Sequence, residues 1–342
     1  MQDPALSFAQ RLIAWQRRHG RHHLPWQCDD PYRIWLSEIM LQQTQVATVI
    51  PYYQRFLDTF PNVMALADAP ADDIMALWSG LGYYSRARNL HHAAKQVRDQ
   101  YGGRFPQSRA ELEKLKGVGR STAAAIAVFA YGAREAILDG NVKRILLRHA
   151  GLDADPAAPA TLRQLWRIAE ARLPESADDL RAYTQGLMDL GASHCARGKP
   201  QCHLCPLAVD CHAYRHDLTA VLPRKKSRAS KPEKDGYFLL VRNARGDAWL
   251  TRRAERGIWG GLYCLPWFES LQALHDFARQ HGLPCPPVHT SLTHHFTHYT
   301  LHLHLVDGGE GSLPLPFIAG HDNLGLPAPI RSLLGSRQQQ LI

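Results

Sequence analysis

The chain has 342 residues, of which 45% are hydrophobic, and this is too long for one ordinary core, so we expect two or three domains that need no disulfides. The N-terminus lacks a signal-peptide pattern, and the longest apolar run, Ala123 to Tyr131, is too short to span a bilayer, which predicts a soluble intracellular protein. A net charge of +9 and a pI near 9.3 favour a polyanionic partner, with nucleic acid as the leading candidate over an acidic membrane.

Apolar residues recur every three or four positions from Phe8 to Tyr214, which predicts a run of short helices. The mostly charged residues 221–235 resemble a basic linker. Beyond them, YFLLVRN, WLTRRA and HYTLHLHL predict strands, and SLQALHDFARQHG predicts one amphipathic helix. We therefore expect a multidomain protein: a mainly α domain over residues 1–220, the linker, and a smaller α+β domain over residues 236–342.

The first candidate site residue lies in PYRIWLSEIMLQQTQV. In a helix, Glu38 shares a face with Ile34, Trp35 and Leu41, so its carboxyl group sits on an apolar stripe. Burial raises the pKa of a carboxyl group, and a protonated acid at neutral pH can serve as a general acid. A satisfied core glutamate is the alternative.

Two polar and aromatic clusters, LQQT and SGLGYYSRARNL, supply residues of the kind that enter a DNA duplex. Enzymes that act on a base take it out of the stack, and wedge residues fill the gap. The candidates are Gln42, Gln43, Tyr83 and Arg86. Tyrosines beside glycines are otherwise often half-buried packing residues.

The segment LKGVGRSTAAAIAVFA places Gly117 and Gly119 between two predicted helices. Glycines there let backbone N–H groups approach a phosphate at a helix N-terminus, and Lys116 and Arg120 add positive charge. An ordinary interhelical turn is the competing interpretation.

Asp139, in ILDGNVKRILLRH, is placed to cap the next helix. The helix N-terminus and nearby Lys143 and Arg144 favour its ionised form, although a cap could be its whole role. Two carboxyl groups in contrasting environments, here Glu38 and Asp139, form the arrangement that breaks glycosidic bonds.

Four of the seven cysteines follow a C-x6-C-x2-C-x5-C pattern over residues 195–211. Four thiolates can bind zinc or a cubane iron–sulfur cluster, and one close pair between two distant singles favours the cluster, with structural zinc as the alternative. Such a closed site favours a structural role. The predicted ligands are Cys195, Cys202, Cys205 and Cys211.

Together these motifs resemble the helix-hairpin-helix base-excision DNA glycosylases with a 4Fe-4S cluster, the hairpin covering about residues 112–131. WLSEIMLQQTQVATVIPYY, LWSGLGYYSRARNLH, LKGVGRST and ILDGNVKR are similar, more narrowly, to the adenine-specific mismatch glycosylases of the MutY family. The resemblance implies monofunctional hydrolysis of adenine from A:8-oxoguanine or A:G mispairs in double-stranded DNA, by a monomer of the bacterial cytoplasm or nucleoid.

The same resemblance implies roles for individual residues. Glu38 would protonate adenine, Asp139 would stabilise the sugar cation or attack it transiently, and Asn141 would help to position both. The implied DNA contacts are Gln42, Gln43, Tyr83, Arg86, Lys116, Gly117, Gly119 and Lys143, and the implied adenine pocket comprises Trp26, Leu41 and Ser121.

Ser121 separates this chain from close relatives, because endonuclease III-type enzymes carry a Schiff-base lysine at that position and many MutY-like proteins carry tyrosine. A serine cannot form the Schiff base, which disfavours the rival interpretation of a bifunctional glycosylase for oxidised pyrimidines. A zinc-dependent DNA-binding protein without enzymatic activity would explain the charge and the cysteines, but would give the carboxyl pair no role.

The C-terminal region resembles the Nudix-related domain of the adenine glycosylases. Its acidic box is missing, since Glu269 and Asp276 alone are acidic between Gly261 and Gly282, so binding is expected rather than hydrolysis. Phe296, Thr297 and His298 occupy the place of the family's Phe-Ser-His loop, which implies recognition of 8-oxoguanine. The histidines between His289 and His304 show no clear metal-ligand pattern.

Overall fold

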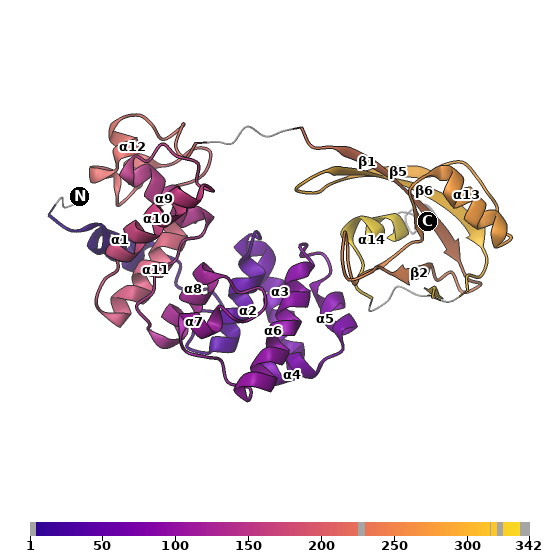
Figure 1. The fold of residues 1–342 in the computed structure, drawn as a ribbon, viewed down its shortest axis with the longest axis horizontal. Coiled ribbons are helices and arrows are strands. Elements are labelled where there is room, and N and C mark those ends of the chain that lie inside the picture. The colour runs from indigo at the N-terminus through magenta and orange to yellow at the C-terminus, as the bar shows by residue number, and fades with distance from the viewer. Residues whose placement is uncertain (1–4, 225–229, 315, 320–323, 336–342) are drawn as a thin grey trace. The chain divides into compact units, whose positions relative to one another are not determined.

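A computed structural model describes residues 5–224, 230–314, 316–319 and 324–335 (Figure 1). The described residues fall into two compact units. The first unit comprises those within Met1–Tyr53, Asn62–Met64 and His92–Ser227, and the second comprises those within Gln54–Pro61, Ala65–His91 and Arg228–Ile342. Each unit is described by itself below.

The N-terminal part of the chain is helical, as predicted. Local signals begin the helices: Ser7 and Gln10 form a capping box before the first helix, and Asp30 caps the second, which starts at Pro31. The helices are α1 (Phe8–His19), α2 (Pro31–Leu41), α3 (Val46–Thr59), α4 (Val63–Asp68), α5 (Ala71–Trp78), α6 (Ser85–Tyr101), α7 (Arg109–Leu112), α8 (Arg120–Tyr131), α9 (Gly140–Ala150), α10 (Pro159–Ala171), α11 (Ala177–Ala192) and α12 (His212–Arg215).

Helices α1, α8, α9 and α11 enclose the core of the first unit. Their buried side chains include Leu12, Ile145, Leu146 and Leu187, and Leu207 of the cysteine segment joins the same core. Buried alanines of α8 allow neighbouring helices to approach closely. The cysteine segment is therefore anchored to the core on which the predicted catalytic segment also rests.

Helices α9 and α11 approach closely at Gly191. A Cβ atom at this position would lie 2.5 Å from the Cβ of Asn141, a separation that packed side chains do not reach. A side chain at Gly191 would therefore push away the helix turn that carries Asn141.

The second unit contains two sheets. The larger has the order β4-β1-β6-β5 and the smaller the order β3-β2-β7. Strand β1 runs parallel to β6, with Glu233 opposite Thr300, whereas β5 is antiparallel to β6. The elements are β1 (Glu233–Arg242), β2 (Trp249–Arg252), β3 (Tyr263–Cys264), β4 (Trp267–Phe268), α13 (Leu271–Gln280), β5 (Thr290–His295), β6 (Thr300–Glu310), β7 (Ile318–Ala319) and α14 (Ala328–Gly335).

Helix α13 packs against the larger sheet through Leu274 and Ala278, beside Leu239, Val241 and Val306 (Figure 1). The three predicted strands and the one predicted helix are thus present.

The predicted linker is too long at its C-terminal end, because β1 begins at Glu233. Residues 225–229 lie outside the described part, but Lys231 donates to the carbonyl of Phe296 (2.8 Å), and Glu233 and Asp235 bond to His302 (3.2 Å) and His304 (2.8 Å). The last charged residues of the predicted linker, Glu233 to Asp235, are therefore exposed residues of a strand.

The second unit also includes helical residues that the sequence assigned to the N-terminal domain. Arg88 donates to the carbonyl of Gly260, Ser79 donates to that of Leu326 (2.6 Å), and the Tyr263 hydroxyl lies 3.3 Å from Asp72. The limits 1–220 and 236–342 stay a prediction about sequence-defined domains. Among the described residues, no helix combines the length and apolarity that crossing a membrane requires.

We expect Gly191→Ala to lower the free energy of unfolding by about 1 to 3 kcal/mol, because the new methyl group overpacks the contact with Asn141. Urea denaturation measures this change. Gly140→Ala, at a helical glycine with open space around it, is the matched control and should be neutral or slightly stabilising. Equal stability of the two variants would contradict the close approach at Gly191.

Candidate active site and cysteine centre

A cavity of about 450 Å³ lies in the first unit, within the range of small-molecule pockets. Trp26, Glu38 and Leu41, all predicted for the site, line it. The remaining lining residues come from α1, from the segment after it and from α2, α3, α8 and α11: Gln16, Arg21, His22, Leu24, Gln27, Cys28, Asp29, Ile34, Ser37, Val46, Phe129, Arg181, Ala182, Gln185 and Met188.

Glu38 has the electrostatics of an acid that keeps its proton. Glu38 lies in α2 among the buried residues Ile34, Trp35 and Met40, and it lines the cavity. Burial, with a smaller contribution from the negative charge of Asp139, raises the pKa of Glu38 to about 8. At neutral pH the carboxyl group is therefore mostly protonated.

Asp139 caps α9, as its sequence context predicted. One carboxylate oxygen accepts a hydrogen bond from the backbone N–H of Val142 at 2.8 Å, while the second has no hydrogen-bond partner among the residues described. The cap leaves half of the carboxylate free to face a developing positive charge. Lys143 follows half-buried in the same helical turn.

Arg144 links Asn141 to the cysteine segment. The side-chain carbonyl oxygen of Asn141 accepts from Arg144 at 2.9 Å, and the same guanidinium donates to the backbone carbonyls of Gly191 (2.7 Å) and Cys195 (2.8 Å). The segment Asp139–Asn141 and the first cysteine therefore share one buried arginine.

The place of Ser121 in an adenine pocket stays a prediction. Ser121 is not among the residues that line the cavity, and its hydroxyl accepts a hydrogen bond from the backbone N–H of Leu138 at 2.9 Å. Because Leu138 directly precedes Asp139, Ser121 supports the backbone of that aspartate.

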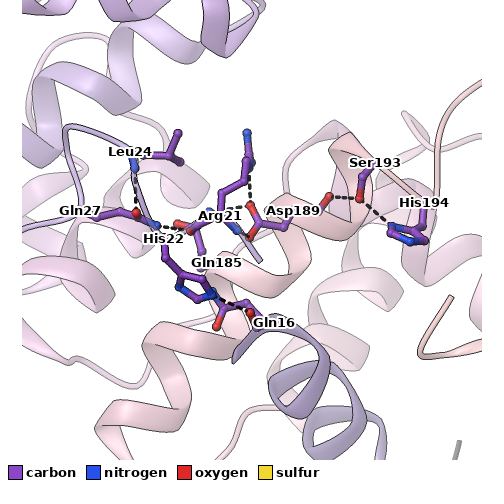
Figure 2. Close-up of polar contacts among 9 residues, drawn as sticks. All are labelled: Gln16, Arg21, His22, Leu24, Gln27, Gln185, Asp189, Ser193 and His194. Atoms are coloured by element: carbon purple, nitrogen blue, oxygen red, sulfur yellow. Dashed lines mark hydrogen bonds and ion pairs between the residues drawn. The ribbon is translucent and has the colours of Figure 1, made fainter. Parts of the chain in front are cut away.

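A buried carboxylate that sequence reasoning missed, Asp189, organises one wall of the cavity (Figure 2). It accepts from the Arg21 backbone N–H (2.9 Å), from Arg21 Nε (2.7 Å) and from Gln185 Nε2 (2.8 Å), and its side chain is 3% exposed. The Gln27 side chain donates to the backbone carbonyl of Arg21 at 2.6 Å and so links residues 21 and 27 of the segment after α1. The signal in the sequence was one acidic residue within the apolar run of α11.

The glycine hairpin lies between α7 and α8. Gly117 has φ +80°, a conformation that favours glycine, whereas Gly119 caps α8 with φ −94° and open space where a Cβ would be. Gln42 Nε2 lies 3.5 Å from both the Gly117 carbonyl and the Thr122 hydroxyl, so the structure brings this predicted DNA contact to the hairpin.

Lys116 is exposed beside the hairpin, but Arg120 is engaged elsewhere. Its guanidinium stacks 3.8 Å over the Trp166 ring and pairs with Glu170 at 2.5 Å. The positive charge predicted on both sides of the hairpin is thus neutralised on one side.

Two of the predicted duplex-probing residues have left-handed backbone conformations. Gln43 has φ +59° and is exposed, and Tyr83 has φ +47° with 45% of its surface exposed. Non-glycine residues rarely adopt such angles, and those that do cluster at functional sites.

Arg86 is buried, in contrast to its expected place on a DNA-facing surface. Its guanidinium lies against the rings of Trp78 and Tyr83 and donates to the carbonyl of Gly82 at 3.2 Å. Burial lowers the pKa of Arg86 to about 10. This arginine supports Tyr83 from beneath.

In the second unit, Phe296, Thr297 and His298 connect β5 to β6. The Phe296 ring is half-buried against Tyr299 (4.8 Å between centroids) and Trp259 (5.7 Å), whereas Thr297 and His298 are exposed. The Thr297 hydroxyl lies 3.3 Å from that of Tyr83, which belongs to the same unit. The packed ring of Phe296 thus anchors a loop whose polar side chains, Thr297 and His298, face solvent.

The four predicted cysteine ligands line one small, mostly apolar cavity in the first unit, and within the described residues none of them forms a disulfide. Burial raises the pKa of Cys205 to about 12. Among the residues of the described ranges, no three histidine, cysteine, aspartate or glutamate side chains converge closely enough to hold a single metal ion. The thiols therefore surround a shared space without meeting at one point.

The histidines of the C-terminal sheet pair with hydroxyl and carboxyl groups. His304 bonds to Ser291 and Asp235, both at 2.8 Å, and His302 bonds to Thr293 (3.1 Å) and Glu233 (3.2 Å). With both ring nitrogens occupied, these imidazoles act as links between strands.

Comparisons with known proteins agree with both parts of this architecture. Residues 36–171 match the family described as "HhH-GPD superfamily base excision DNA repair protein", and residues 237–336 match the NUDIX domain family. Among solved structures, a thermostable thymine-DNA glycosylase is similar with a TM-score of 0.55 and 30% identity, covering 61% of this chain and 95% of its own. An endonuclease III–DNA complex, with a TM-score of 0.52 and 21% identity, supports the fold.

Curated relatives extend the similarity over nearly the whole chain. An adenine DNA glycosylase from Buchnera aphidicola (Acyrthosiphon pisum) is 34% identical over 96% of both chains. The human adenine DNA glycosylase is 39% identical over 60% of this chain and 39% of its own. With the carboxyl pair, the glycine hairpin and the cysteine segment assembled as described, the chain belongs to the adenine DNA glycosylase family of helix-hairpin-helix base-excision enzymes.

Proposed function

We propose that this protein is a monofunctional adenine DNA glycosylase that hydrolyses the N-glycosidic bond of adenine mispaired with 8-oxoguanine or guanine. Family membership supports excision of adenine in base-excision repair. The observation that carries the proposal for the site is Glu38, a carboxyl group in a cavity wall with a pKa of about 8 and an ionisable aspartate nearby.

In this mechanism Glu38 donates its proton to the adenine base, which then leaves as a neutral molecule. Departure creates positive charge on the sugar, and the unpartnered oxygen of Asp139 stabilises that charge. Water captures the cation and leaves an abasic site. Asn141 and Ser121 act as positioning residues, because they fix the backbone on either side of Asp139.

The wall formed by Asp189 provides a basis for adenine recognition. A carboxylate accepts hydrogen bonds but cannot donate them, so Gln185 must direct its NH₂ group towards Asp189. Gln185 lines the cavity, and its side-chain carbonyl oxygen is then left as an acceptor. Adenine carries an amino donor where guanine carries a carbonyl, so an acceptor here favours adenine.

We propose a 4Fe-4S cluster as the cofactor, held by Cys195, Cys202, Cys205 and Cys211. The four thiols line one cavity, and their spacing, one close pair between two distant single cysteines, favours a cluster over structural zinc. When bound, the cluster supplies rigid cross-linking of a segment that has little apolar surface of its own.

The C-terminal unit reads the base opposite adenine in this proposal. Phe296, Thr297 and His298 present a stacking face and polar groups of the type that contact bases, while the acidic residues of a hydrolytic Nudix site are missing. Thr297 keeps the hydroxyl of the family's serine and adds a methyl group. The partner is mispaired double-stranded DNA, and we place the protein in the bacterial cytoplasm, acting as a monomer.

A bifunctional glycosylase of the endonuclease III type explains the observations less well. The Ser121 hydroxyl is committed to the Leu138 backbone and cannot form a Schiff base. A zinc-dependent DNA-binding protein would leave the high pKa of Glu38 without a role.

Glu38→Gln should abolish adenine release while leaving duplex binding nearly unchanged, since the amide keeps the shape but has no acidic proton. Single-turnover excision and gel-shift binding on an A:8-oxoguanine duplex measure the two effects. In the wild type the rate should fall as pH rises through about 8, because deprotonation removes the acid. Turnover retained by the variant would remove Glu38 from the mechanism.

Stability provides an independent check on the same residue. Native Glu38, with its pKa near 8, keeps a proton that the unfolded chain releases near 4.5, so the stability contributed by this residue falls as pH rises from about 4.5 to 8. The unfolding free energy of Glu38→Gln relative to wild type should therefore increase from pH 5 to pH 8. A constant difference across that range would show that Glu38 is not protonated in the native protein.

Metal analysis tests the cofactor. The purified protein should be brown and contain iron and sulfide, and Cys202→Ser should lose cluster and stability, because the segment folds around the metal. Cys285→Ser, at an exposed cysteine outside the segment, should keep both. Stoichiometric zinc without iron in anaerobically purified protein would overturn the cluster.

Phe296→Ala with His298→Ala should weaken discrimination of A:8-oxoguanine from A:G by about tenfold to a hundredfold, since one base contact is worth about 1 to 3 kcal/mol. Single-turnover excision on both duplexes gives the ratio. His295→Ala, at an exposed histidine of the preceding strand, is the control, and Thr297→Ser should have a mild effect. An unchanged ratio in the double variant would show that this loop does not read the lesion.

A further inference from the structure

A buried arginine, Arg148, lies with the four cysteines in the wall of their cavity. It projects from the last turns of α9, one turn beyond Arg144, and is 3% exposed. Its Nη1 lies 3.5 Å from the Sγ of Cys195, so the guanidinium reaches the first predicted ligand directly.

The remaining hydrogen bonds of Arg148 join both ends of the cysteine segment. Nη1 donates to the carbonyl of Ala196 at 2.8 Å, just after the first cysteine. Nη2 donates to Thr219 at 3.0 Å and Nε to Leu222 at 2.8 Å, both beyond the last cysteine. One side chain of the core thus fastens the segment where it begins and where it returns.

These oxygen acceptors satisfy the N–H groups but do not balance the charge. Carbonyl oxygens are neutral, and within the described part of the chain Arg148 makes no ion pair with a carboxylate. By contrast, Arg11 pairs with Asp210 and Arg21 with Asp189. A buried guanidinium without a counter-ion is destabilising, and a nearby anion would offset this.

The cysteines can provide that anion when they bind metal. A metal-bound thiol is deprotonated, and four thiolates outweigh the charge of a zinc ion or of a cubane core, which leaves the centre negative. Of the described residues that line the cavity, Arg148 is the one with a permanent charge. A negative metal–thiolate centre would therefore explain both the position of Arg148 and the lack of an ion pair with a carboxylate among the described residues.

We propose that Arg148 is the fixed counter-charge of the metal–thiolate centre, and that its charge and its N–H···S contact to Cys195 set the reduction potential and the metal retention of that centre. The inference rests on the proposed cofactor. Net charge and hydrogen bonds to sulfur are two of the factors that set the potential of an iron–sulfur cluster. A nearby cation stabilises the more negative, reduced form, so its removal should shift the potential to more negative values.

The test compares Arg148→Lys, Arg148→Gln and Arg148→Met with wild type in the full-length protein. Iron and sulfide per chain, and the cluster potential from voltammetry at an electrode, are measured for each. We expect Arg148→Gln and Arg148→Met to hold less iron, and the cluster that remains to have a more negative potential. Arg148→Lys, which keeps the charge, should lie closer to wild type in both respects.

Arg224→Gln is the matched control. Arg224 follows the same segment, but it is exposed and paired with Asp153 at 2.6 Å, so loss of its charge should leave iron content and potential unchanged. Full iron in Arg148→Gln with the wild-type potential would overturn the inference. If the glutamine and methionine variants fail to fold, a lysine variant that retains iron and potential supports the counter-charge, whereas one that fails equally overturns it.

The wild-type protein separates this inference from the proposed cofactor. If wild type holds zinc, the cluster proposal fails, and the counter-charge is then tested by the rate at which a chelator removes zinc from the same variants. Faster release from Arg148→Gln than from Arg148→Lys supports the inference, and equal rates overturn it.

Discussion

The close contact of α9 with α11 is the constraint on which the rest of the first unit depends. Gly191 lets the two helices meet at Asn141. At that distance Arg144 can bridge Asn141, Gly191 and Cys195, and Arg148 can reach the thiols one turn further along the same face. One helix therefore carries the proposed catalytic aspartate at its N-terminus and, along its side, the arginines that contact the proposed metal-binding segment, so the two cannot shift independently.

The sequence predicted those parts of the site that depend on local chemistry. Helical spacing set Glu38 on an apolar face, and the cap at Asp139 follows from a side chain bonding to a backbone only three residues away. Cysteine spacing identified the segment that lines its own cavity. The β-rich texture after residue 235 predicted the change to sheets, because alternation over a few residues is also a local property.

The contacts that sequence reasoning did not predict mostly join distant parts of the chain. Asp189 and Arg21 are 168 positions apart and meet only when α11 folds against the segment after α1. Ser121 and Arg86 are residue types typical of such sites. In the fold, however, Ser121 bonds to the backbone of Leu138, and Arg86 lies against the ring of Tyr83. Arg120 stacks on Trp166 and does not add free positive charge to the hairpin, and no local sequence pattern predicts this contact.

The contacts at the start of β1 restrict where residues can be inserted into or deleted from the chain. Lys231 donates to the carbonyl of Phe296, and from Glu233 to Leu240 the strand pairs with β6 in continuous parallel register. A single inserted residue within this stretch would exchange the two faces of the strand and move Leu239 and Val241 out of the core that they form with α13. Insertions and deletions between the two domains should therefore accumulate before Lys231 and stop there, where the chain is already tied to the loop at Phe296.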